Sequence, residues 1–206
     1  MTKILNNLIK KNIQKLITGN FEKLAPTYYR LISEWMNSSY EVFNDIDKYR
    51  IILYLINKDF EHYIQIKKIE SYDNFFMFDK SLELDRINII EISKSLNIPK
   101  ESTRRKILDL EKLNVLQKIG KKIYIDRSAY RLVQPKNTLK NLSALLSKIS
   151  EILKIENLID KSLNVDEVSK HLKENFSYCW YYFYIFIFTL TLRWKKQLGD
   201  LEIYSV

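Results

Sequence analysis

Glycine and proline are scarce in this chain of 206 residues, which contains only three of each. β-sandwiches, barrels and nucleotide-binding folds with glycine-rich loops need many positions with special backbone conformations. The scarcity argues against these folds. Hydrophobic residues make up 46% of the chain, which is enough for one sizeable core. The composition therefore predicts a mainly α-helical protein.

Cysteine occurs once, at Cys179, so no disulfide can form within the chain and nothing points to an oxidising compartment. The first residues, "MTKILNNLIKKNIQKLI", alternate apolar positions with lysine and asparagine and lack the continuous apolar region of a signal peptide. We expect a cytoplasmic protein, associated with the nucleoid if it binds DNA.

Motifs for catalysis are also missing, because "GxxxxGK[ST]", "GxSxG" and "HExxH" do not occur. His62 and His171 have no cysteine, histidine or carboxylate around them at the spacing of a metal site. The sequence therefore predicts neither an enzyme nor a metal or cofactor.

Positive charge is present and is concentrated in one region. The formal net charge is +9, of which residues 1–93 contribute zero, residues 94–131 contribute +7 and residues 132–206 contribute +2. A concentrated basic block indicates a polyanionic partner.

This basic block has a compact local pattern. Asn88 and Glu91 form a capping box for the short helix "IIEISKSL". Asn97 can end that helix with a positive φ, and Pro99 suits the first position of the next helix. We expect the second helix to end at Asn114 and to turn four side chains inward: Ile107, Leu108, Leu110 and Leu113.

Two short strands follow in "VLQKIGKKIYIDR", with a turn at Gly120 and Lys121. Helix, turn, helix and hairpin is the order of a winged helix-turn-helix. The expected architecture is mainly α, with N-terminal helices for packing or dimerisation over residues 1–45. A winged helix-turn-helix covers residues 46–133 and C-terminal dimerisation helices cover residues 134–206. We also expect capping boxes at Ser38–Glu41 and at Asn164–Glu167, and an irregular connection over residues 71–85.

The run "PKESTRR", residues 99–105, resembles the start of the recognition helix in Crp/Fnr-type bacterial transcription regulators, "S-R-E-T-V-x-R". The helical segments on both sides of the module resemble the arrangement in MarR and PadR regulators. The first resemblance implies that Glu101 and Arg105 read base edges and that Lys100 and Ser102 make flanking contacts.

The chemistry of these residue types points the same way. Glu101 and Arg105 are four residues apart and share one helical face, although such a pair is also an ordinary surface ion pair. A guanidinium matches guanine and a carboxylate accepts from cytosine in the major groove. With the recognition helix at about 99–113 and the wing at 117–124, the candidate DNA-binding residues are Lys100, Glu101, Ser102, Arg104, Arg105, Lys118, Lys121 and Lys122.

The run "NFSYCWYYFYIFIFTLTL", residues 175–192, carries no charge. Its length is near the ~20 residues of a membrane helix, but tyrosines fill its first half and argue against a membrane span. A helix that is apolar on all sides is buried on all sides. We therefore expect a dimer core from this helix, with a pocket for a small apolar effector as an open alternative. The core candidates are Trp180, Tyr184, Ile185, Phe188 and Leu192.

Together these features predict a transcription regulator that binds double-stranded DNA as a homodimer. A plasmid or phage replication initiator, a winged-helix protein-interaction module of a chromosome-associated complex, and a membrane-anchored regulator are the alternatives.

Overall fold

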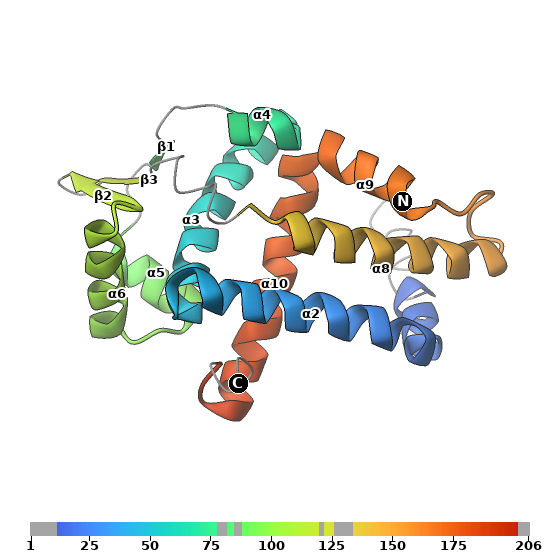
Figure 1. The fold of residues 1–206 in the computed structure, drawn as a ribbon, viewed down its shortest axis with the longest axis horizontal. Helices are drawn as coiled ribbons and strands as arrows, with labels where there is room; N and C mark the ends of the chain where they lie inside the picture. The colour runs from blue at the N-terminus through green and yellow to red at the C-terminus, as the bar shows by residue number, and fades with distance from the viewer. Residues whose placement is uncertain (1–11, 78–81, 85–87, 120–121, 126–133, 202–206) are drawn as a thin grey trace, which may run out of the picture. The chain divides into compact units, whose positions relative to one another are not determined.

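The structure is a computed structural model that describes residues 12–77, 82–84, 88–119, 122–125 and 134–201. It is mainly helical, as predicted (Figure 1). Residues 12–19 are helical and precede the helices α2 (Phe21–Phe43), α3 (Ile46–Gln65), α4 (Tyr72–Met77), α5 (Ile89–Leu96), α6 (Lys100–Lys112), α8 (Lys136–Ile155), α9 (Val165–Glu174) and α10 (Phe176–Leu198). The strands are β1 (Leu82–Leu84), β2 (Leu116–Ile119) and β3 (Lys122–Ile125).

The chain divides into two compact units, each built from segments that are distant in the sequence. Unit 1 comprises Met1–Trp35 and Lys136–His171, and unit 2 comprises Met36–Pro135 and Leu172–Val206. These units cut across the three consecutive segments that we expected, because α10 belongs with the central segment. The functional roles assigned to the three segments stay predictions.

In unit 1, serine side chains of α8 hold the segment that leads into α9. Ser147 Oγ donates to the carbonyl oxygen of Leu163 at 2.8 Å, and the Leu163 amide donates to Ser150 Oγ at 2.9 Å. The capping box of α9 is confirmed, since the Glu167 amide donates to Asn164 Oδ1 and the Asn164 amide donates to Glu167 Oε2.

The capping box predicted at Ser38–Glu41 is wrong, because α2 continues to Phe43. The chain turns at Asn44, whose φ is 48° and which therefore occupies the left-handed region. Asp45 then caps α3, its side chain accepting from the Lys48 amide at 3.0 Å. Ser39 is buried within α2, so its hydroxyl is not placed to begin a helix.

In unit 2, α10 lies along α3 in the antiparallel direction. Phe60, near the end of α3, contacts the ring of Phe176 at the start of α10, with ring centroids 5.7 Å apart. Lys195, near the end of α10, bonds Asp47 in the first turn of α3. Between these two ends, Tyr54 and Phe60 of α3 pack against aromatic side chains of α10, namely Phe176, Tyr184 and Phe188.

The helix predicted through the uncharged run is confirmed by α10, but its burial is one-sided. Trp180 and Tyr184 are buried as expected, and Phe188 and Leu192 are partly buried. Ile185 is 40% exposed and is therefore not part of the core within this chain. The exposed face of α10 also carries other large side chains, namely Tyr178, Tyr182 and Phe186. Within the described ranges, no helix has the length and apolar character needed to cross a membrane.

The strands form a three-stranded antiparallel sheet in the order β1-β3-β2. The two strands predicted around Gly120 are confirmed: Leu116 pairs with Ile125 across β2 and β3, and both side chains are buried. The sequence did not predict β1 or α4, since residues 71–85 were expected to be an irregular connection.

Candidate nucleic-acid interface

The turn between α5 and α6 is fixed by a closed set of backbone and side-chain hydrogen bonds. Asn88 caps α5 as predicted, its Oδ1 accepting from the Glu91 amide at 2.8 Å. Asn97 ends the helix with φ 51°, also as predicted. The Ile98 amide donates to the Ser93 carbonyl at 3.0 Å, and Ser93 Oγ donates to the Ile98 carbonyl at 2.7 Å. These reciprocal bonds leave the chain little freedom at the point where α6 begins.

The inward face of α6 differs from the predicted one. Ile107 and Leu110 are buried as expected, whereas Leu108 is 44% and Leu113 is 56% exposed. The third buried position is Thr103, which lies four residues before Ile107 and so shares its face. Thr103 Oγ1 donates to the Pro99 carbonyl at 3.1 Å, so the buried hydroxyl is satisfied. The prediction favoured leucine over threonine and missed this bond.

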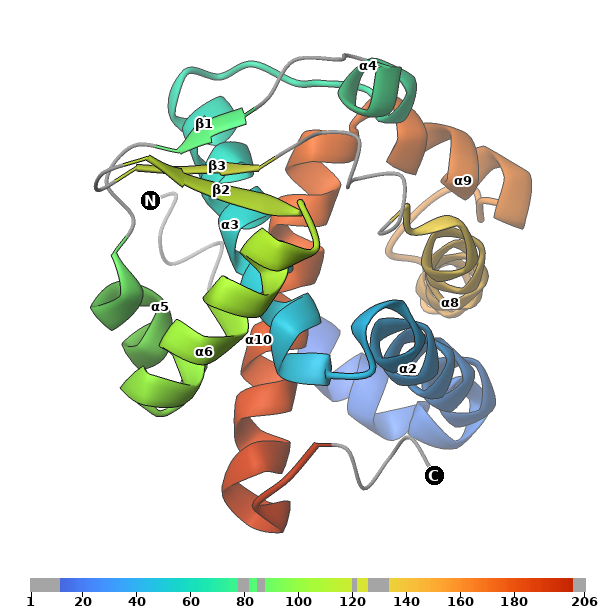
Figure 2. The same ribbon diagram turned by 60° about the vertical axis from the view of Figure 1, so that its left-hand side comes forward.

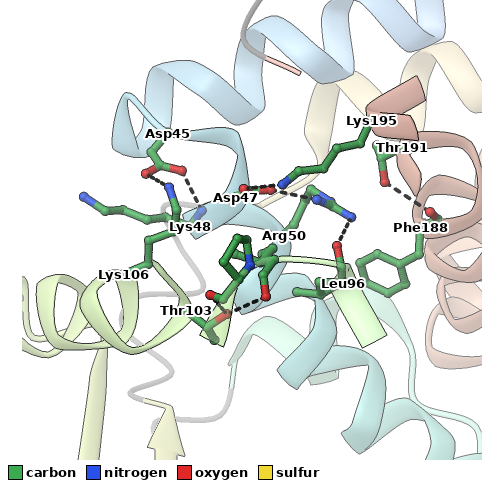
Figure 3. Close-up of polar contacts among 12 residues, drawn as sticks. Asp45, Asp47, Lys48, Arg50, Leu96, Thr103, Lys106, Phe188, Thr191 and Lys195 are labelled. Atoms are coloured by element: carbon green, nitrogen blue, oxygen red, sulfur yellow. Dashed lines mark hydrogen bonds and ion pairs between the residues drawn. The ribbon is translucent and has the colours of Figure 1, made fainter. Parts of the chain in front are cut away.

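Two ion pairs join the sides of α6 to the first turn of α3, and Figure 3 shows one of them, between Lys106 and Asp45. Lys106 bonds the carboxylate of Asp45, the residue that caps α3. Lys48 lies 3.3 Å from a carboxylate oxygen of Asp109. In one pair α6 supplies the cation and in the other it supplies the anion. Both pairs hold the same face of α6 toward α3.

A buried arginine supports the end of α5. The Arg50 side chain is completely buried; its Nη1 donates to Asp47 at 2.7 Å and its Nη2 donates to the Leu96 carbonyl at 3.0 Å (Figure 3). Lys195 of α10 also donates to Asp47, at 2.7 Å. Burial alone would raise the pKa of Asp47, but its ion pairs with Arg50 and Lys195 outweigh burial and hold the pKa below its ordinary value. Positive charge at the last carbonyls of a helix is stabilising.

The other side of α5 is joined to α3 by a polar cluster. Tyr54 OH donates to Glu91 Oε1 at 2.9 Å and accepts from Ser95 Oγ at 3.2 Å. Lys58 lies 3.6 Å from the same Glu91 carboxylate. With Arg50, this cluster gives α5 polar attachments to α3 at both of its ends.

The outward face of α6 carries the candidate recognition residues. Lys100, Glu101, Arg104 and Arg105 are exposed, and Ser102 is partly buried. Glu101 is paired with Arg104 at 2.9 Å, not with Arg105 as the four-residue spacing suggested. Arg105 makes no hydrogen bond or ion pair with any other described residue, so its guanidinium is available to a ligand.

The three hairpin lysines are described only in part. Lys118 and Lys122 lie in β2 and β3, where Lys118 pairs with Ile123 and Lys122 with Ile119. Lys121 lies outside the described residues, and the side chains of Lys118 and Lys122 do as well. Their contact with DNA stays a prediction from the sequence.

In the part of the chain that the structure describes, no group of three or more histidine, cysteine, aspartate or glutamate residues is placed to hold a metal ion. The outward face of α6 is a charged surface on which Arg105 has no hydrogen-bond or ion-pair partner among the described residues. Comparison with family models, with curated proteins and with solved structures found no match for this chain.

Proposed function

We propose that the chain is a sequence-specific transcription regulator that binds double-stranded DNA through a winged helix-turn-helix in unit 2. The order α3, α4, β1, α5, α6, β2, β3, with strands arranged β1-β3-β2, supports this assignment (Figure 2). In this proposal α6 enters the major groove, and the β2–β3 hairpin lies against the backbone or the minor groove.

The observation that carries the proposal is the difference between the two faces of α6. Its inward face is fixed by Thr103, Ile107 and Leu110 and by ion pairs to α3, so the outward face is presented on a rigid support. That face carries Arg105, which has no hydrogen-bond or ion-pair partner among the described residues. A guanidinium with free donors is the side chain best suited to bind guanine O6 and N7 in the major groove.

The surroundings of α6 favour a phosphate backbone. Lys100, the first residue of α6, and Lys94, in the last turn of α5, are exposed, and residues 94–131 carry a net charge of +7. Pro99 precedes α6 without forming a side-chain cap, so the free amides of the first turn can face an anion. Such contacts supply affinity and position, whereas Arg105 supplies specificity.

The regulator acts as a homodimer in this proposal. One 13-residue helix reads few base pairs, whereas two helices spaced by ~34 Å read a palindrome. The exposed face of α10, with Tyr178, Tyr182, Ile185 and Phe186, is an uncharged surface of the kind that dimers bury.

The test is to isolate the DNA that the protein binds from the whole genome and to measure its affinity for that DNA and for random duplex over a range of salt concentrations. A regulator binds sites in promoters more tightly than random DNA, and its log K falls linearly with log salt. A replication initiator would instead recover repeated sites at an origin. Absence of salt-dependent duplex binding would favour the protein-interaction module and overturn the proposal.

A further inference from the structure

An apolar side chain lies in the middle of the polar outward face of α6. Of the three apolar residues in this helix, Ile107 and Leu110 are buried and Leu108 is 44% exposed. The attachment of α6 to α3 does not need Leu108, because Lys106 and Asp109 provide it together with the buried side chains. The folded chain thus leaves Leu108 free to contact a ligand.

Leu108 is a neighbour of Arg105 on the helix surface. Residues three apart lie on adjacent turns of one face, and three residues rise about 4.5 Å along a helix axis. Consecutive base pairs of duplex DNA rise about 3.4 Å. Where Arg105 meets one base pair, Leu108 therefore faces the same base pair or one of the next two.

The major groove offers one apolar group to such a side chain, the C5-methyl group of thymine. We propose that Leu108 recognises a thymine within about two base pairs of the guanine bound by Arg105. This inference rests on the proposed function and makes it more specific. Arg105 and Leu108 together would distinguish a guanine with a thymine nearby from a guanine with a cytosine or uracil at the same place, because neither of those bases carries the methyl group.

The test uses the tightest duplex recovered from the genomic selection, in which each thymine near the contacted guanines is replaced in turn by deoxyuridine. This change removes one methyl group and keeps the base pairing. We expect the wild-type protein to lose about fourfold in affinity at one position, which corresponds to ~0.8 kcal/mol for one buried methyl group. Leu108→Ala should bind the thymine duplex more weakly and should show no further loss with deoxyuridine at that position.

Two matched variants complete the experiment. Leu113→Ala removes an exposed leucine at the end of α6, beyond the outward face, and should keep the full sensitivity to deoxyuridine. Arg105→Ala should bind more weakly yet remain sensitive to the methyl group. Wild-type insensitivity at every thymine overturns the inference, as does a Leu108→Ala protein that still distinguishes thymine from deoxyuridine. Either result leaves DNA binding intact, whereas a protein that binds no duplex at all overturns the proposed function and this inference with it.

Discussion

Arg50 Nη2 donates a hydrogen bond of 3.0 Å to the carbonyl oxygen of Leu96, the last residue of α5. The guanidinium is completely buried, and its counter-ion Asp47 is shared with Lys195 of α10. A buried charge is stable only while its partners remain in place. The position of the turn before α6 therefore depends on a carboxylate in α3 and an ammonium group in α10.

Replacing Asp47 with asparagine should destabilise unit 2 strongly. The change leaves the Arg50 charge buried without a counter-ion, which costs about 3–5 kcal/mol. Urea unfolding at neutral pH would measure the loss. The matched control is Asp109→Asn, which breaks the more exposed pair with Lys48 and should cost about 0–1 kcal/mol. Equal losses in the two variants would contradict the special role of Asp47.

The same carboxylate gives a prediction for pH. The pKa of Asp47 in the folded protein is lower than the ordinary value of 3.8 that it regains on unfolding. The ionised group therefore contributes stability that is complete well above pH 3.8 and is lost as the pH falls through the folded pKa. The difference in unfolding free energy between the wild type and Asp47→Asn should shrink between pH 6 and pH 3. A difference that does not change with pH would mean that the pair is not ionic.

Arg105→Ala should weaken binding to the specific DNA site by about 1–3 kcal/mol and relax the preference at one base pair. Affinities for the selected duplex, for its single-base variants and for random DNA give the measurement. Arg104→Ala is the control, because Glu101 already engages that guanidinium. We expect its effect to be smaller and similar on all duplexes. If Arg105→Ala also reduces affinity equally for specific and random DNA, Arg105 contacts only phosphate.

Replacing Lys118, Lys121 and Lys122 together with glutamine should weaken binding to every duplex by a similar factor. Lysines that neutralise phosphates release counter-ions, so the slope of log K against log salt should flatten by roughly 0.9 for each phosphate that is no longer neutralised. The ranking of DNA sequences should not change. A salt slope identical to that of the wild type would show that the hairpin does not approach the DNA backbone.

Ile185→Asp should produce monomers that keep their fold and lose tight binding to a palindrome. Ile185 is exposed within the chain, so a charge there leaves the core intact but opposes burial against a second copy. Sedimentation at micromolar concentration measures the association, and circular dichroism checks the fold. Leu158→Asp, at an exposed leucine after α8, is the control and should remain dimeric. A wild-type protein that is monomeric at these concentrations would contradict the dimer itself.

Local signals in the sequence were sufficient for the caps of α5 and α9 and for the left-handed residue Asn97. Each depends on side chains that act within a few residues of the helix end, so spacing alone identifies them. The capping box at Ser38 failed because an equally local but competing signal, Asn44 followed by Asp45, ends α2 five residues later.

Two of the missed features, strand β1 and the contacts of Arg50, depend on distant segments. Strand β1 is paired with β3, as in Leu84 opposite Ile123, and its three residues are too few to identify a strand from the sequence alone. The role of Arg50 depends on Leu96 and on Asp47, which also binds Lys195, and no spacing rule brings α10 to the first turn of α3. The partner of Glu101 was also missed, because spacings of three and four residues are both allowed on a helix and only the packed side chains decide between them.

The antiparallel contact of α10 with α3 has a consequence for the newly made protein. Asp47 and Lys195 are separated by 148 residues, so α3 leaves the ribosome long before the helix that covers its aromatic side. Until α10 is synthesised, Phe60 lacks its contacts with Phe176 and Tyr184, and the apolar surface left exposed can bind chaperones. A message truncated before codon 172 would therefore yield a chain with an intact helix-turn-helix sequence that aggregates before it can reach DNA.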